Sequence, residues 1–406
     1  MLKALPLVFV LSGLALYAVL GGADLGAGFW QLATARRRDG RAVREFAHHA
    51  MGPVWETNHV WLIFVLAMFW TSYPKAFGSV MSTLAVPLFI ALLGIIFRGI
   101  TYALREGAET PHESGRIDTV FAVSSVLVPF ALGTAIGGIA GNRVPVGNAA
   151  GHEWSSWLNG PSIVIGILAV ATSAYMAAVY LAADAAKDRE HELEYSFRLR
   201  AIGSGVVAGA VAISGIFALK ADNHHLFHTL SSGRALPAVI VSALAGLTTL
   251  ACVYERLYEP ARYAASLAVA AIVAGWALSR WPTILPGLSV DQAAAPHDIL
   301  VSVVVVVLAG AVILLPSLVW LFGLALAGRF RAPELNVTVT PINHPMPRIG
   351  LRARVAAACF IVGGGMLNLA NAQWAHVVGV TCLFGFIGLA FSAIVASAVE
   401  QDAKAE

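Results

Sequence analysis

Long apolar runs separated by short polar stretches follow one another along the whole chain. A helix needs about 20 apolar residues to cross the hydrocarbon core of a bilayer. By that measure the pattern predicts nine membrane-spanning helices, at 6–33, 55–73, 77–104, 118–141, 161–183, 200–220, 235–255, 261–280 and 297–327. Two further apolar runs, at 353–371 and 374–399, predict an extra C-terminal helical hairpin. The expected fold class is therefore an all-α polytopic membrane protein.

The lengths of the polar stretches predict how these helices are grouped. We expect a first four-helix bundle over 1–142, an external loop over 143–160 and a second four-helix bundle over 161–280. A loop and a peripheral ninth helix follow over 281–328, then a proline-rich cytoplasmic linker over 329–351 and the C-terminal hairpin and tail over 352–406.

Basic residues predict the orientation, because cytoplasmic loops of membrane proteins carry an excess of lysine and arginine. If the nine helices alternate in direction, all but six of the 26 lysines and arginines fall on one face. The six exceptions are Lys3, Lys75, Arg143, Lys220, Arg234 and Arg280. We therefore expect the N-terminus outside and the C-terminus in the cytoplasm.

Composition supports the membrane assignment. The 406 residues are 58% hydrophobic and 12% charged, whereas soluble domains carry about 25% charged residues. A net charge of +3 argues against a nucleic-acid partner. The three cysteines (Cys252, Cys359 and Cys382) lie in apolar runs and show neither a disulfide framework nor zinc-ligand spacing.

Four charged residues of the first bundle lie near the cytoplasmic ends of predicted helices: Asp24, Glu56, Arg98 and Asp118. Asp24 is the deepest of them, and a buried carboxylate requires a partner. We expect an Asp24–Arg98 ion pair, with Asp118 as a possible third member, that fixes the packing of the first, third and fourth helices. Alternatively, Asp118 and Glu56 are ordinary charges at helix N-termini, and Arg98 extends to the membrane surface. Glycines near Asp24 (Gly21, Gly22, Gly26 and Gly28) favour close helix packing.

Histidines offer weaker candidates. His224 and His228 have the i, i+4 spacing of a zinc site, but the glutamate of a metalloprotease motif is missing, so solvated loop histidines are expected. His59 is a conceivable haem ligand without an evident second ligand. We therefore expect no metal or cofactor ligand in this chain.

Several motifs, in order along residues 1 to about 330, resemble subunit II of the cytochrome bd-type quinol oxidases. WETNHVWL at 55–62 is similar to the W-D-G-N-x-V-W-L signature of that family. Further matches are GGADLGAGFW at 21–30, the YP and FRG motifs around the third helix, and the stretch that begins WPTILPGL at 281–288.

The resemblance implies a nine-helix, haem-free subunit of a bacterial inner-membrane complex that oxidises quinol and reduces O2 to water. A partner, subunit I, would carry the quinol site and haems of the b and d types. The signature carboxylate, Glu56 here, would open a proton path from the cytoplasm, with Asn58 orienting Glu56 or a water. Trp55 and Trp61 would pack at the helix entry, and Asp24, Arg98 and Asp118 would support the haem site.

The sequence departs from the family pattern in two places. Glu56 and Thr57 replace the usual Asp and Gly, which puts the route of the protons in question. The chain after residue 330 exceeds the usual family length, and its apolar runs could cover the bundle, contact an extra subunit or replace a small accessory helix. A stand-alone transporter and a scaffold or assembly protein without an oxidase role are the rival functions.

Overall fold

Helices make up nearly all of the chain that the structure describes. The computed structural model describes residues 2–35, 39–105 and 111–326, and isolated stretches between 354 and 392; within its helices it leaves the side chains of 48–57 and 111–114, among others, undescribed. The chain divides into two units, Met1–Trp320 and Leu321–Glu406. Each unit is described by itself.

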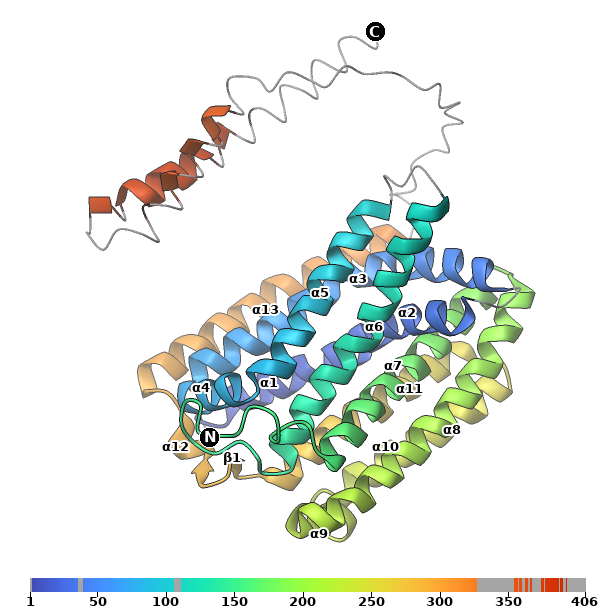
Figure 1. Ribbon diagram of the computed structural model, residues 1–406, viewed down its shortest axis with the longest axis horizontal. Helices are drawn as coiled ribbons and strands as arrows, with labels where there is room; N and C mark the ends of the chain where they lie inside the picture. The colour runs from blue at the N-terminus through green and yellow to red at the C-terminus, as the bar shows by residue number, and fades with distance from the viewer. Residues whose placement is uncertain are drawn as a thin grey trace. The chain divides into compact units, whose positions relative to one another are not determined.

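The first unit contains the membrane-spanning helices (Figure 1). Its first part consists of α1 (Leu5–Leu16), η1 (Tyr17–Gly21), α2 (Gly22–Thr34), α3 (Gly40–Ser72), α4 (Pro74–Thr83), α5 (Ala85–Arg105) and α6 (Pro111–Ala140). Its second part consists of α7 (Gly160–Lys187), α8 (His191–Asp222), α9 (His224–Ser231), α10 (Leu236–Tyr254), α11 (Tyr258–Arg280), β1 (Thr283–Leu285), β2 (Leu288–Ser289), α12 (Val290–Ala293) and most of α13 (His297–Leu326). The first unit ends at Trp320, so the last residues of α13 belong to the second unit.

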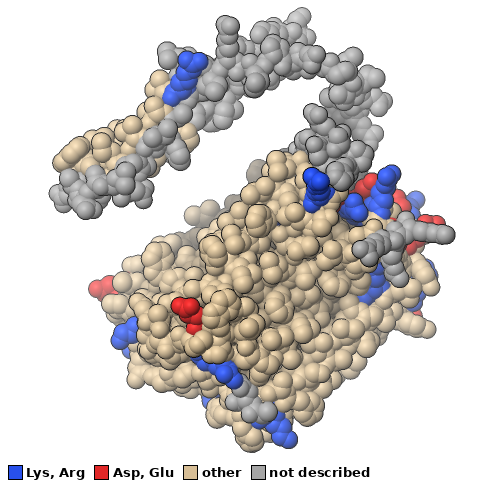
Figure 2. All heavy atoms as spheres, in the orientation of Figure 1, with Lys and Arg blue, Asp and Glu red and all other residues tan. Residues whose placement is uncertain are grey.

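The apolar pattern located these helices well. Among the described residues, 8 helices are long and apolar enough to span a membrane, and Asn58–Ser72 of α3 is a shorter apolar stretch. Together they correspond to the nine predicted segments. Figure 2 shows the matching surface, on which charged side chains gather toward the two ends and leave the sides between them almost uncharged.

The prediction for the second helix was wrong at its N-terminus. We expected the helix to begin at residue 55, but α3 begins at Gly40 and runs for 33 residues. Arg41, Arg44 and Glu45 are polar but have high helix propensity, so the helix continues past the end of its apolar run. Trp55, Glu56 and Trp61 consequently lie within α3 and not at a helix entry.

The predicted helix 77–104 is interrupted. α4 ends at Thr83 and α5 begins at Ala85, with Leu84 between them at φ −102° and ψ 23°. Pro87 explains the break, because a proline ring clashes with the carbonyl of the residue four positions earlier, here Thr83. A second irregularity is η1, one π-helical turn between α1 and α2. The ring of Tyr17 lies where a side chain at Gly21 would be, 3.2 Å from the position of a Cβ.

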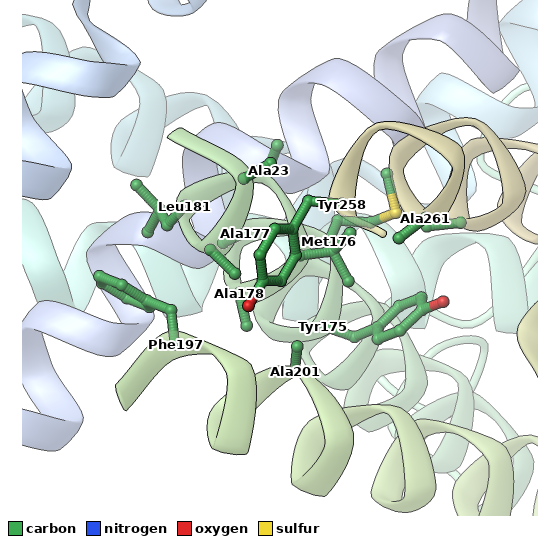
Figure 3. Close-up of a cluster of buried hydrophobic side chains, with 14 of the residues drawn as sticks. Ala23, Tyr175, Met176, Ala177, Ala178, Leu181, Phe197, Ala201, Tyr258 and Ala261 are labelled. Atoms are coloured by element: carbon green, nitrogen blue, oxygen red, sulfur yellow. The ribbon is translucent and has the colours of Figure 1, made fainter. Parts of the chain in front are cut away.

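α7 lies at the centre of the first unit and packs against α2, α6, α8 and α11. Small side chains make this possible, because they allow helix backbones to approach closely. Ala177 and Ala178 are fully buried, together with Met176 and Leu181 (Figure 3). Ala182, one turn further along α7, is fully buried as well. Gly26 on α2 is required in the same way, because a Cβ there would overlap the backbone carbonyl of Ser173 on α7.

At the end of the unit that carries β1 and β2, loops form a cap. Residues 141–159, which nearly coincide with the predicted external loop 143–160, form turns and irregular structure and contain no helix. Arg280 ties this cap together, since it donates hydrogen bonds to the carbonyls of Ile139 (3.0 Å) and Ile284 (3.1 Å) and to Asn142 Oδ1 (2.9 Å).

The second unit is described only in part. The predicted linker 329–351 lies outside the described residues, as does much of the predicted hairpin. Where the unit is described, Val377–Phe386 is helical and apolar. A Cβ at Gly363 would lie 3.0 Å from the carbonyl oxygen of Gly379 and from Leu383, so the two apolar runs pack against each other there.

Candidate functional site

A charged centre lies buried between α2, α5 and α6. The Arg98 guanidinium donates hydrogen bonds to Asp24 Oδ1 on α2 and to Ser125 Oγ on α6. Arg98 is 1% exposed and Asp24 is 4% exposed. The ring of Phe121 also covers the guanidinium, with its centroid 4.2 Å from Cζ. The structure thus brings Asp24 and Arg98 together, as the sequence led us to expect. We call Asp24, Arg98 and Ser125 the inner centre.

Two local features set the geometry of the inner centre. The Ser125 hydroxyl donates to the backbone carbonyl of Phe121 at 2.6 Å, which leaves its oxygen free to accept from Arg98. Gly28, one turn after Asp24 on α2, provides the space, because a Cβ at this position would overlap the Ser125 side chain and lie 3.4 Å from Arg98 Nη1. The glycines around Asp24 therefore allow the charged centre to assemble.

Asp118 belongs to a different pair. Its Oδ2 accepts a hydrogen bond from Arg44 Nη1 on α3 at 3.0 Å, and Asp118 is 7% exposed. The expectation that Asp118 opens a helix was wrong, since α6 begins at Pro111. The suggested third place beside Asp24 and Arg98 is taken by Ser125, which lies seven residues, or two helical turns, after Asp118. Asp118 and Arg44 form what we call the outer pair.

The energetic cost of the inner centre is considerable. It lies within helices that have the length and hydropathy of membrane spans, where an unpaired charge costs about 2.5–3.5 kcal/mol or more. Pairing offsets this cost only while both partners are present. Removing one partner of a buried pair typically costs about 3–5 kcal/mol.

The structure describes only some of the candidate side chains on α3. The side chains of Trp55 and Glu56 lie outside the described part of the structure, although their backbone is helical. Asn58 is 2% exposed, and neither Oδ1 nor Nδ2 has a hydrogen-bond partner in the described chain. Trp61 is half-buried and makes an edge-to-face contact with Phe64, with ring centroids 6.4 Å apart.

Sequence reasoning missed several polar residues near the inner centre: Ser125, Arg44, and Gln31 on α2, which is 3% exposed and whose Oε1 has no hydrogen-bond partner among the described residues. For Ser125 and Gln31, the spacing along their helices was a signal that could have found them. Asp24 and Gln31 are seven residues apart, as are Asp118 and Ser125, and this spacing returns to the same helix face after two turns.

Another arginine–aspartate pair lies in the other half of the first unit. Arg262 on α11 donates to Asp184 on α7 and to the carbonyl of Tyr180 at 2.9 Å. The two side chains are 20% and 27% exposed, so this pair is less buried than the inner centre.

A further pair joins the loop before α3 to α8. Arg200 donates to Asp39 Oδ2 at 2.6 Å, and Ser196 donates to the same oxygen at 3.3 Å. Burial acts to raise the pKa of Asp39, but the hydrogen bond and positive charge of Arg200 outweigh it and hold the pKa below its ordinary value.

No group of three or more potential metal ligands occurs among the described residues. His224, His225 and His228 are exposed on α9, a short helix that the sequence reading took for a loop. His59 lies on α3 beside Asn58 and interacts with a neighbouring residue. The described histidines therefore add no metal site to the inner centre and the outer pair.

The fold and these features define a polytopic α-helical membrane protein with a paired charge inside its first group of helices. The chain belongs to the cytochrome bd terminal oxidase subunit II family, whose profile matches residues 2–325. The bd oxidase structure from Geobacillus thermodenitrificans is similar in fold, with a TM-score of 0.63 over 80% of this chain and 99% of that one, at 22% identity.

Curated relatives match over a shorter stretch. The cytochrome bd ubiquinol oxidase subunit 2 of Bacillus subtilis (strain 168) is 27% identical over 114 residues, 28% of this chain and 33% of the relative. Subunit 2 of the cytochrome bd-I ubiquinol oxidase of Escherichia coli (strain K12) is 24% identical over 123 residues, 30% of this chain and 32% of the relative. The matched stretches therefore span about a third of these relatives.

Proposed function

We propose that this chain is the haem-free subunit of a bacterial inner-membrane quinol oxidase, in which a partner subunit carries b- and d-type haems and reduces O2 to water. The observation that carries this proposal is the inner centre, placed within a chain of the subunit II family. An ion pair sealed inside spanning helices is costly to maintain for packing alone. Its presence supports a role in shaping the surface that receives the haem-bearing subunit.

We further propose that protons for O2 reduction enter along α3 from the cytoplasm, with the N-terminus of the chain outside. Reducing O2 to water consumes protons, and a carboxyl group whose pKa is raised by desolvation can pass them on. Positions four and seven residues after Glu56 share its face of the helix. Those residues, Val60 and Ile63, are 56% and 64% exposed on this chain, which supports a contact between that face and the partner subunit.

Asn58 has a different place in this proposal. Residues two apart on a helix do not face each other, so Asn58 is poorly placed to orient Glu56 directly. Its buried amide lies on a helix that packs against α1 and η1. A buried amide with no hydrogen-bond partner among the described residues is suited to hold a water. We therefore assign Asn58 to water binding inside this chain.

Isolation of the tagged chain from its native membrane tests the assignment to an oxidase. We expect a second, haem-bearing subunit to co-purify and the reduced-minus-oxidised spectrum to show b- and d-type bands. A chain that is isolated alone and colourless would contradict the proposal and favour a transporter or a scaffold protein.

Glu56→Gln tests the proton path in the purified complex. We expect a lower rate of quinol-dependent oxygen consumption with unchanged haem content, because glutamine cannot carry a proton. Glu45→Gln is the matched control, since Glu45 lies on the same helix with an exposed side chain. Equal rates for the two variants would remove Glu56 from the path.

A further inference from the structure

Gln31 is a buried polar residue that the proposed function leaves without a role. It lies on α2 with 3% exposure, and its Oε1 has no hydrogen-bond partner among the described residues. Leaving such an oxygen unsatisfied destabilises the folded protein, because the oxygen loses its hydrogen bond to water and gains none in return. An apolar residue at the same place would avoid that cost, so a glutamine at this position indicates that its amide binds a ligand.

Helix geometry places Gln31 between the inner centre and the outer pair. Asp24 and Gln31 are seven residues apart on α2 and share a face, about 10 Å apart along the helix. On α6, which runs in the opposite direction, Ser125 and Asp118 have the same spacing. Because Gly28 on α2 lies against the Ser125 side chain on α6, Gln31, three residues further along α2, lies about 4.5 Å beyond the level of Ser125 on the way to Asp118.

The helices that surround this level are also fixed by contacts. α2 packs against both α3 and α6, and the Arg44–Asp118 pair joins α3 to α6. Thr101, one turn after Arg98 on α5, is buried as well at 6% exposure. Buried polar groups thus continue from the outer pair through Gln31 and Thr101 to the inner centre.

We propose that Gln31 binds a water molecule that connects the outer pair to the inner centre, so that α2, α5 and α6 enclose a hydrated column open at the end that carries Arg44. A buried water typically has about three hydrogen bonds and requires polar partners on more than one side. Gln31 Oε1 accepts one, and the Asp118 carboxylate, which lies further toward the outer pair on the neighbouring helix α6, is an acceptor for another. The use of the column in proton supply rests on the proposed oxidase function.

A high-resolution map of the assembled wild-type complex tests the site itself. We expect density for a water within hydrogen-bond distance of Gln31 Oε1. The proposal is overturned if that oxygen is instead bonded to a protein group of either subunit. This result does not depend on activity, so it decides the site even if the oxidase assignment fails.

Gln31→Met tests the function of the water, because methionine is similar in length and cannot hold it. We expect turnover to fall several-fold with normal haem content, and the solvent deuterium isotope effect on turnover to rise as proton supply becomes limiting. Gln31→Glu, which keeps an acceptor oxygen, should restore most of the rate. Thr34→Val is the control, because Thr34 is buried on the same helix but its hydroxyl is already bonded to the Trp30 carbonyl at 2.7 Å.

Two outcomes would contradict the functional part. Turnover of Gln31→Met equal to that of Thr34→Val would show that the column does not supply protons. A fall in turnover with an unchanged isotope effect would show a purely structural role. If the wild-type complex itself lacks quinol oxidase activity, the proposed function is wrong. The water site is then tested by the high-resolution map alone.

Discussion

Two arginine–aspartate pairs, one in each half of the first unit, use the same chemistry at different degrees of burial. Arg98 and Asp24 are sealed between three helices, with side chains 1% and 5% exposed. Arg262 and Asp184 lie near helix ends, because Arg262 follows the start of α11 at Tyr258 and Asp184 precedes the end of α7 at Lys187. Their side chains are 20% and 27% exposed.

The difference shows what each pair contributes. Water can reach Arg262 and Asp184, so if one partner is lost the other can be solvated. Water does not reach the inner centre, so if Arg98 or Asp24 is lost, the charge that remains is neither paired nor solvated. A fully buried ion pair such as the inner centre contributes little net stability, because removing both charges from water is costly. We infer that the inner centre is kept for function and that the Arg262–Asp184 pair is kept to join α7 to α11.

The largest effect is expected for Arg98→Met. The Asp24 carboxylate would be left buried without a counter-charge, at a cost of roughly 3–5 kcal/mol. The yield of assembled complex from membranes, measured by haem content per milligram of protein, should fall sharply.

Replacing both partners provides the control. In the double variant Arg98→Met with Asp24→Leu, no charge is stranded, and apolar replacement of a buried pair is often neutral or stabilising. We expect most of the yield to return while turnover stays low. Recovery of both yield and turnover would show that the pair has no role beyond packing.

Arg262→Met is expected to have an intermediate effect. It removes the hydrogen bonds to Asp184 and to the Tyr180 carbonyl, but partial exposure lets water replace them. We expect a loss of roughly 1–2 kcal/mol, between the values for exposed pairs and for buried charge-assisted bonds. The midpoint of thermal unfolding in detergent measures it. A loss as large as that of Arg98→Met would mean that exposure does not distinguish the two pairs.

Hydropathy alone predicted most of this fold, because spanning a bilayer imposes a length and a composition on each helix. It was wrong where a helix extends past its apolar run, as α3 does, and where a local clash acts, as at Pro87. The proline was visible in the sequence. Its effect was missed because the apolar run continues unbroken on both sides of it.

The candidate site was predictable to the extent that charges in apolar runs stand out. Asp24 and Arg98 do so, and the structure brings them together. Ser125 and Gln31 do not, because a serine or a glutamine in a helix is unremarkable until neighbouring helices bury it. Arg44 was read as a loop residue, so its pairing with Asp118 required the true start of α3.

The smallest effect is expected for Asp39→Asn, which removes the charge of a partly exposed carboxylate but keeps an oxygen that accepts from Arg200. The side chain of Asp39 is 38% exposed and that of Arg200 is 8% exposed. Because water reaches the carboxylate side of the pair, we expect a loss of about 1 kcal/mol, the upper end of the range for exposed pairs. Because the pKa of Asp39 is lowered in the folded protein, its contribution is fully present above the ordinary value of 3.8 and disappears as the pH falls through the lowered pKa. Thermal midpoints of wild type and variant should therefore differ slightly at neutral pH and converge in acid. A gap that widens below the ordinary pKa would show that Arg200 does not stabilise the ionised carboxylate.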